Sequence, residues 1–246
     1  MKNAIRSRIG HPALTLAWML GVSVIYSPSA AFPQEPGSGE AHEHKTPGNE
    51  HQGQGMHHDF SDVASFASRF EGPERRAWQK PEHVISLLAI EPGMTVVDIG
   101  AGTGFFAPYL AAAVGAGGRV LALDVEPNMV KHIEQRVEDE GLSSVEPKLI
   151  PYDDPQLMAG SVDRILIVDT WHHIDDRGAY SRKLLEALRP GGRVYVVDFT
   201  EESPVGPPRR HRLRSEQVAE ELSAGGLEVS QLEEELPNQY VVMGRR

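Results

Sequence analysis

The chain has 246 residues, of which 40% are hydrophobic and 24% are charged, so it can bury a full core as one α/β domain with extensions. Its formal net charge of −11 disfavours a general nucleic-acid-binding role, because affinity for phosphate backbones comes mainly from Lys and Arg. The sequence contains no cysteine, which excludes disulfides and thiolate chemistry within it and offers no cysteine for a lipid anchor.

Residues 1–31 have the layout of a secretory signal peptide. Lys2, Arg6 and Arg8 form a basic head, PALTLAWMLGVSVIY an apolar middle, and SPSAAF an exit of small residues. We expect cleavage near Ala30 or Ala31 and a periplasmic or secreted protein. Removing these three basic residues from a chain of net charge −11 leaves −14. An uncleaved signal would instead leave a membrane-tethered protein, and a buried core helix is a further interpretation of the apolar middle.

Residues 32–59 are rich in Gly, Pro, Glu and Gln and nearly free of apolar side chains, so we predict a disordered linker. Five of the eleven histidines lie in it: His42, His44, His51, His57 and His58. Imidazoles can bind Zn, Cu or Ni, but these spacings match no defined structural site. A solvated tether is the simpler interpretation, and we predict no metal site.

The folded domain is expected over residues 60–246, and its first elements are helical. One set of apolar residues recurs at helical spacing: Phe60, Val63, Phe66, Ala67 and Phe70. Pro73 is expected to break this run. A second helix is expected to begin at Pro81, because proline is favoured in a first helical turn. Its apolar set is Val84, Ile85, Leu87 and Leu88.

After residue 93 the pattern changes to short apolar runs separated by plausible helices. The runs are MTVVDIG, GRVLALDV, VEPKLIP, VDRILIVDT and GGRVYVVDF. The helices are expected over 105–114, 127–139 and 176–188, the last closed by RPGG. Near-continuous apolar strands that alternate with helices indicate a parallel sheet covered on both faces.

The C-terminal region predicts one helix and two strands. SEQVAEELSAGG offers Ser215 as an N-cap and a glycine stop. LEVSQLEEEL and QYVVMGRR follow, and two strands this close in sequence can pair directly only as an antiparallel hairpin. We therefore predict a Rossmann-like, doubly wound α/β fold with a mostly parallel seven-stranded sheet and an antiparallel C-terminal hairpin.

The stretch TVVDIGAGTGFFAPYL places three alternate glycines behind a strand that carries Asp98. Residues 102–107 fit the fingerprint of a dinucleotide-binding turn, which would indicate an NAD-dependent oxidoreductase. Asp98 opposes that assignment, because two like charges about 4 Å apart repel by roughly 4 kcal/mol at an effective dielectric near 20. S-adenosylmethionine has no phosphate and carries an ammonium and a sulfonium, so it suits this carboxylate. Asp124, at the end of VLALD, can accept both ribose hydroxyls of either cofactor.

DTWHHIDD follows the fourth predicted strand, at the edge where open α/β sheets bind ligands. His172 or His173 could remove a proton from an oxygen or nitrogen nucleophile, and His172 is our candidate. The alternative is that a histidine packs against or caps the next helix. A basic cluster follows the fifth strand: Arg209, Arg210, Arg212 and Arg214. It could recognise an acidic substrate, or pair with local glutamates in a solvated loop.

These motifs resemble those of the class I S-adenosylmethionine-dependent methyltransferases over residues 60–246. They are VVDIGAGTG, VLALDVEPNMV, PYDDPQL, SVDRILIVDTWHHIDD and LLEALRPGGRVYVVDF. The branch that they resemble most includes the ubiquinone and menaquinone methyltransferases. The resemblance implies transfer of a methyl group from S-adenosylmethionine to a small-molecule acceptor. A methyltransferase acting on arsenite would rely on cysteines, which this chain lacks.

The same resemblance implies a cofactor site. It assigns the methionine portion to Asp98, Gly100, Gly102 and Gly104, the ribose to Asp124, the adenine amino group to Asp153, and a further cofactor contact to Asp169. FEGPERRAWQKP resembles the approach segment of exported members, where Trp78 and Lys80 would border the cofactor mouth. An exported cofactor- or metal-binding protein without turnover remains an alternative. Transient contact with a membrane surface is a further expectation, and the sequence predicts no oligomeric state.

Overall fold

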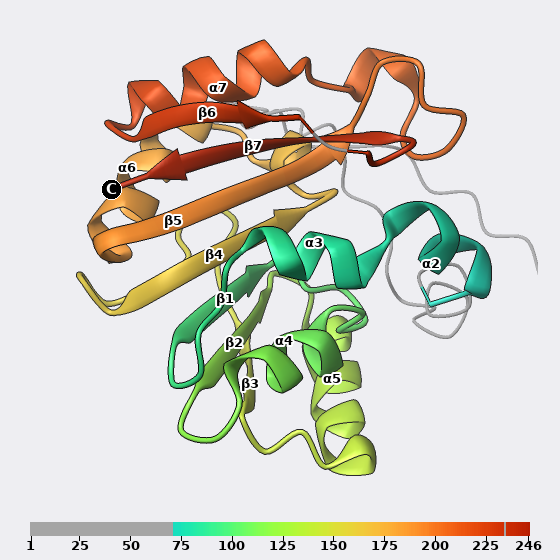
Figure 1. Cartoon of the computed structure of the whole chain (residues 1–246), viewed down its shortest axis with the longest axis vertical. Helices are drawn as coiled ribbons and strands as arrows, with labels where there is room; N and C mark the ends of the chain where they lie inside the picture. Colours follow the sequence, from blue (N-terminus) through green and yellow to red (C-terminus); the bar gives the residue numbers. More distant parts are fainter. Residues whose placement is uncertain (1–70, 234) are drawn as a thin grey trace, which may run out of the picture. The chain divides into compact units, whose positions relative to one another are not determined.

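The computed structural model describes residues 71–233 and 235–246, which form helices around one seven-stranded sheet (Figure 1). The predicted signal peptide, the predicted histidine-rich linker and the predicted helix over residues 60–70 lie outside the described residues.

The sheet contains β1 (Thr95–Ile99), β2 (Arg119–Asp124), β3 (Val145–Leu149), β4 (Val162–Val168), β5 (Leu188–Phe199), β6 (Glu228–Leu232) and β7 (Gln239–Arg245). Their order across the sheet is β3-β2-β1-β4-β5-β7-β6. The first five strands pair in parallel, and β7 runs antiparallel to both β5 and β6. The predicted mostly parallel sheet with an antiparallel C-terminal hairpin is confirmed. The order of strands reverses between β1 and β4, which is where such sheets bind ligands.

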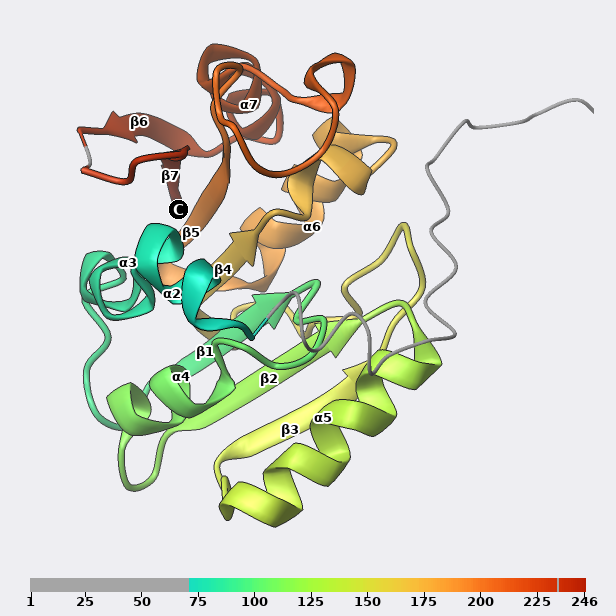
Figure 2. The same ribbon diagram turned by 90° about the vertical axis from the view of Figure 1, so that its right-hand side faces the viewer.

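The helices are α2 (Pro73–Gln79), α3 (Pro81–Leu87), α4 (Ala107–Val114), α5 (Pro127–Glu140), α6 (Arg177–Ala187) and α7 (Ser215–Ala224), with short 3₁₀ turns η1 (Trp171–His173) and η2 (Arg209–His211). Residues of α3, α4 and α5 belong to one buried apolar cluster, and residues of α6 and α7 belong to a second. Figure 2 shows α4 and α5 over the β1–β3 half of the sheet. The sheet is therefore covered on both faces, as the apolar strands predicted.

Adjacent strand residues divide between these two clusters because successive side chains point to opposite faces of a sheet. In β1, Val96 belongs to the first cluster and Val97 to the second. In β4, Leu166 belongs to the first, and Ile165 and Ile167 belong to the second. Strands with both faces buried need an apolar residue at nearly every position, which explains the continuous runs in the sequence.

Three local predictions are corrected. Pro73, expected only as a break, begins α2, because proline fits the first turn, where its missing N–H costs nothing. Ser215 is not an N-cap: Arg214 holds that position without a side-chain cap, and the Ser215 hydroxyl donates to the side chain of Gln231 at 3.3 Å. RPGG falls within β5, where the pairing register with β4 shifts between Val162 and Arg164.

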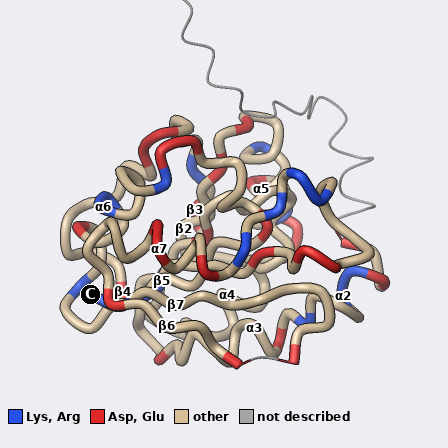
Figure 3. Tube along the Cα trace, turned by 90° about the horizontal axis from the view of Figure 1, so that it is seen from above, with Lys and Arg blue, Asp and Glu red and all other residues tan. Residues whose placement is uncertain are grey.

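Charged residues of both signs are interspersed along the described chain, as seen from above in Figure 3. The mixture accords with the modest acidic excess of the whole sequence, which has 35 Asp and Glu against 24 Lys and Arg. No helix among those described is long and apolar enough to cross a membrane.

Gly100 lies in the turn after β1 and packs closely against Thr170 in the turn after β4. Its φ is +72°, and a Cβ at this position would lie 2.2 Å from Oγ1 and 2.4 Å from Cγ2 of Thr170. Such distances are far inside van der Waals contact, so only glycine fits without displacing Thr170.

Replacing Gly100→Ala is expected to lower the free energy of unfolding by about 3 kcal/mol, because left-handed strain adds to overpacking. Gly93→Ala is the matched control: its φ is +89°, but no atom lies within 4 Å of the added Cβ, so only the backbone cost of about 1 kcal/mol applies. Urea denaturation of both variants measures the difference. Equal losses would show that Thr170 moves aside freely.

Candidate functional site

Four carboxylates lie at the carboxyl edge of the parallel strands. Asp98 is the penultimate residue of β1, Asp124 ends β2, Asp169 directly follows β4, and Asp198 is penultimate in β5. Asp98, Asp124 and Asp198 are buried. Because charged groups in a protein interior need compensating partners, the contacts of each acid define what this edge can bind.

Of these four acids, Asp98 has the fewest partners among the described residues. Its exposed fraction is 3%, and no group among residues 71–233 and 235–246 donates a hydrogen bond to its carboxylate. Burial and, to a smaller extent, the charge of Asp124 raise its pKa to about 7, although Arg75 opposes the rise. A carboxylate in this state gains most from a ligand that brings a cationic hydrogen-bond donor.

Asp124 supports the glycine turn from within. Its Oδ2 accepts the backbone N–H of Gly102 at 2.7 Å, and its Oδ1 accepts the N–H of Glu126 at 2.9 Å. Burial raises its pKa, and these backbone hydrogen bonds oppose the rise. Gly102 has a φ of +57°, and a Cβ there would meet no atom within 4 Å. Asp124 thus holds the glycine turn in place on one side. On the other side, the space where a side chain of residue 102 would lie is open, so a ligand can approach the backbone closely.

Asp169 is held by residues from distant elements. Its φ is +53°, its Oδ1 accepts from Nε2 of Gln239 at 2.6 Å, and its Oδ2 lies 3.6 Å from the guanidinium of Arg75. Gln79 in turn donates to Oε1 of Gln239 at 2.6 Å. Burial raises the pKa of Asp169 to about 7, although Arg75 opposes the rise. This polar network ties α2 to β7 and to the end of β4.

Sequence reasoning missed this network because its members carry no shared local signal. Gln79 and Gln239 are 160 positions apart. Arg75 lies in the segment that the sequence analysis singled out, and its guanidinium stacks 4.5 Å from the ring centroid of Phe105. Only the packing of α2 over the sheet edge brings these residues together.

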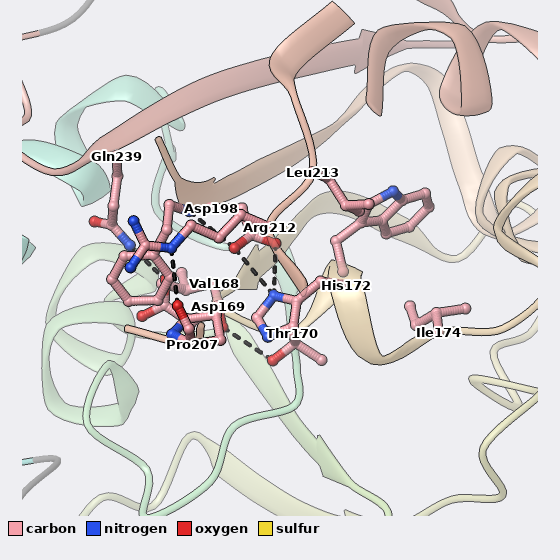
Figure 4. A network of polar contacts seen from close by, with 12 residues as sticks. Val168, Asp169, Thr170, His172, Ile174, Asp198, Pro207, Arg212, Leu213 and Gln239 are labelled. Carbon is pink, nitrogen blue, oxygen red and sulfur yellow. Dashed lines mark hydrogen bonds and ion pairs between the residues drawn. The ribbon is translucent and has the colours of Figure 1, made fainter. Parts of the chain in front are cut away.

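His172 lies beside Asp198 at the end of β5 (Figure 4). Its Nδ1 is 3.1 Å from Oδ1 and 3.0 Å from Oδ2 of Asp198, and both side chains are buried. Burial alone lowers the pKa of His172, but the hydrogen bond and charge of Asp198 outweigh it and raise that pKa. The sequence analysis missed Asp198, although it is the penultimate residue of an apolar strand, as Asp98 is.

Neither histidine caps the following helix. Asp176 is the N-cap of α6, and its Oδ1 accepts the N–H of Ala179 at 2.9 Å. His172 and His173 form η1 with Trp171, and their ring centroids are 4.2 Å apart. The capping alternative is therefore wrong, and His172 lies at the carboxyl edge of the parallel strands.

The predicted basic cluster does not form one site. Arg212 donates to five backbone carbonyls of the preceding loop, those of Thr200, Glu201, Ser203, Val205 and Pro207, at 2.6 to 3.2 Å. Arg209 pairs with Glu201 and Glu202, and Arg210 and Arg214 are exposed. Arg212 therefore organises the loop, and Arg209 matches the alternative of pairing with local glutamates.

The remaining predicted residues lie around the same edge. Asp153 is exposed in the loop after β3, and its backbone carbonyl accepts from Lys183 at 2.6 Å. Trp78 packs against Phe199 with ring centroids 5.7 Å apart, and Lys80 donates to the carbonyl of Glu235 at 2.7 Å. Lys80 therefore fastens the β6–β7 connection to the junction of α2 and α3. Within the described part of the chain, no group of three or more His, Asp or Glu side chains is arranged to hold a metal ion.

Comparison with known proteins finds that the chain is similar to methyltransferases. The family model described as "Methyltransferase domain" matches residues 96–192. The ubiquinone/menaquinone biosynthesis C-methyltransferase UbiE of Idiomarina loihiensis is 28% identical over 131 residues, which cover 51% of this chain and 49% of that protein. Methyltransferase GfsG of Streptomyces halstedii is 32% identical over 124 residues, covering 48% of this chain and 42% of that protein.

A solved structure extends the similarity beyond these segments. The crystal structure of a SAM-dependent methyltransferase from Aquifex aeolicus superposes with a TM-score of 0.70 at 28% identity, covering 74% of this chain and 97% of that one. The chain spans about half the length of the curated relatives it matches. The structural match therefore supports the fold and cofactor class more broadly than the sequence matches support any particular acceptor.

Replacing Asp98→Asn is expected to remove a pH dependence of stability. The pKa of Asp98 rises from 3.8 to about 7 on folding, so between these values the folded protein holds a proton that the unfolded chain has released. Wild-type stability should therefore fall as pH rises from about 4 to about 7, by up to about 4 kcal/mol from this group.

Urea denaturation at pH 4 and pH 8 measures this effect. The stability of Asp98→Asn relative to wild type should be greater at pH 8 than at pH 4, whereas that of the exposed control Asp175→Asn should not change between the two pH values. The same pH dependence in wild type and Asp98→Asn would mean that Asp98 is not the titrating group.

Proposed function

We propose that this chain, which belongs to the class I S-adenosylmethionine-dependent methyltransferases, transfers a methyl group from S-adenosylmethionine to a small-molecule acceptor. Family membership rests on the methyltransferase-domain match, the fold and the similarity to the Aquifex aeolicus enzyme. S-adenosylmethionine is the cofactor of this family, and its sulfonium supplies an electrophilic methyl group. The acceptors of the relatives are not carried over, because the chain matches only about half of their length.

The observation that carries the proposal is the buried carboxylate of Asp98 beside the open glycine turn, which accepts no hydrogen bond from a residue in the described part of the chain. Such a carboxylate fits the ammonium of a methionine moiety, and the open surface above Gly102 fits a ligand lying close to the backbone. We propose that Asp98, Gly100, Gly102 and Gly104 hold the amino-acid end. Asp124 would bind the ribose, Asp153 the adenine amino group, and Asp169 would be a further contact.

The internal hydrogen bonds of the turn argue against a dinucleotide. A pyrophosphate needs free backbone N–H groups where the glycine turn meets the helix. Here the N–H of Gly102 is bonded to Asp124, and the N–H of Gly104 is bonded to the carbonyl of Ala101 at 2.8 Å. With the negative charge of Asp124 behind the turn, this edge is suited to a cationic ligand and unsuited to phosphate.

On the acceptor side, the residue proposed to touch substrate is His172. It lies at the same edge of the sheet as Asp98 and Asp169, and an imidazole can accept a proton near neutral pH. Transfer to a good nucleophile otherwise depends mainly on alignment with the methyl group, which a closed site supplies by positioning.

Binding of S-adenosylmethionine tests the cofactor assignment. Calorimetry should show S-adenosylmethionine and S-adenosylhomocysteine binding while NAD stays silent. Asp98→Asn should weaken binding of S-adenosylmethionine by about 10- to 100-fold, the usual effect of losing a charged hydrogen bond. Wild-type affinity should rise from pH 6 to pH 8, because Asp98, with a pKa of about 7, must ionise to pair with an ammonium.

The control for this measurement is Asp175→Asn, which changes an exposed acid and should leave the affinity unchanged. If the protein binds NAD and does not bind S-adenosylmethionine, the result would favour the NAD-dependent oxidoreductase alternative. Wild-type affinity in Asp98→Asn would remove Asp98 from the site.

We further propose that residues 60–246 form the methyltransferase domain and that residues 32–59 tether it after export. The basic head, apolar middle and small-residue exit of residues 1–31 support export with cleavage near Ala30 or Ala31. N-terminal sequencing of protein from fractionated cells tests this proposal, and a mature chain that begins near Phe32 in the periplasmic or secreted fraction is expected. Intact Met1 in a membrane fraction would indicate a tethered enzyme, and intact Met1 in the soluble cytoplasm would overturn export.

A further inference from the structure

We propose that Asp198 is a positioning residue that orients His172 so that Nε2 takes a proton from the acceptor, and that the acceptor therefore carries a removable hydrogen on the atom to be methylated. The inference rests on the proposed methyl transfer and specifies its acceptor class. Hydroxyl groups, primary or secondary amines and acidic carbons belong to this class, whereas thioethers and tertiary amines do not.

The geometry fixes one side of the imidazole. Both oxygens of Asp198 lie within 3.1 Å of Nδ1 of His172. The carboxylate is itself anchored, because Oδ1 also accepts the backbone N–H of Phe199 at 2.8 Å. The exposed fractions are 3% for the His172 side chain and 1% for that of Asp198, so water competes little for this contact.

This contact selects the tautomer of the neutral ring. A carboxylate only accepts hydrogen bonds, so Nδ1 must carry the hydrogen, and the lone pair falls on Nε2. No described residue is hydrogen-bonded to Nε2, which lies on the side of the ring away from Asp198 (Figure 4). The arrangement suits a general base and differs from a histidine that serves only as a structural donor.

Charged groups on several elements face the ring. Asp198 on β5 and Asp169 after β4 favour the protonated form, Arg177 on α6 opposes it, and the ring of His173 lies alongside. Burial lowers the pKa of His172, but the acids outweigh it, so that pKa is raised. As pH falls, His172 is therefore protonated at a higher pH than a free histidine is. Its neutral, basic form returns as pH rises.

The proton balance is complete without a further reactant. The bond between the acceptor atom and its hydrogen breaks, and the proton goes to Nε2. The electron pair left on the acceptor atom forms the new bond to the methyl carbon, and the pair of the former carbon–sulfur bond stays on sulfur. His172 then releases the proton to solvent.

The test compares Asp198→Asn with Glu221→Gln in the full chain. Glu221 accepts from Nε1 of the neighbouring Trp171 and pairs with Nε of Arg177, both at 2.9 Å, so its variant perturbs the same turn and a neighbouring charge without changing a hydrogen bond of His172. In Asp198→Asn the amide oxygen stays on the N–H of Phe199, so the NH₂ group replaces Oδ2, the carboxylate oxygen nearer to Nδ1 at 3.0 Å. Nitrogen-15 NMR should show Nδ1–H in neutral wild-type His172, Nε2–H in Asp198→Asn, and wild-type signals in Glu221→Gln.

Turnover is followed as S-adenosylhomocysteine released with a low-molecular-weight cell extract as the source of acceptor. Asp198→Asn should lower kcat by about 100-fold or more with little change in KM, as expected for losing a general base. The acid limb of the pH–rate profile of Asp198→Asn should move to lower pH. Its affinity for S-adenosylmethionine, measured by calorimetry, should stay at the wild-type value. Mass spectrometry should show a product that has gained CH₂ without a new permanent charge.

Several outcomes would overturn the inference while leaving the proposed function intact. These are an Nε2–H tautomer in the wild type, an unchanged rate in Asp198→Asn, and a product that has gained CH₃ with a permanent positive charge. Failure of the wild type to bind S-adenosylmethionine would instead reject the proposed function, and the NMR measurement would still decide whether Asp198 orients His172.

Discussion

The placement of carboxylates at one edge of a parallel sheet is the constraint on which the site depends. Parallel strands all end at the same edge, so an acid at the end of each of several strands concentrates negative charge where water is largely excluded. The protein compensates three of them in different ways: Asp124 with backbone amides, Asp169 with Gln239 and Arg75, and Asp198 with His172. Within the described residues Asp98 has no such hydrogen-bond donor, and it borders the open turn.

The covering elements follow from the same constraint. Helix α2 brings Arg75 and Gln79 over the sheet edge, where the guanidinium offsets the charges of Asp98 and Asp169. Across the edge, the loop after β5 is organised by Arg212, whose guanidinium donates to five of its backbone carbonyls. Both segments are held mainly by contacts of a few side chains, which for α2 include the packing of Trp78 against Phe199, so their placement depends on those residues.

Two groups of residues along the edge correspond to the two halves of the proposed chemistry. Asp98, Asp124 and the glycine turn belong to β1 and β2, and they suit a ligand with a cationic end. His172 and Asp198 belong to β4 and β5, and they suit proton transfer. The fold brings these halves together at the reversal of strand order, but the fold alone does not choose the acceptor.

The sequence by itself determined the strands, the sheet class, the glycine turn and the positions of Asp98 and Asp124 at strand ends, because these features come from local periodicity and from the residue types at strand ends. The tertiary structure decided which side chains meet. In the folded chain His172 lies against Asp198, and Gln79 donates a hydrogen bond to Gln239. Arg212 bonds to backbone carbonyls and does not form one site with Arg209, and Ser215 donates to Gln231 and does not cap a helix. Such contacts depend on the packing of segments far apart in the chain, and no local pattern of residues records that packing.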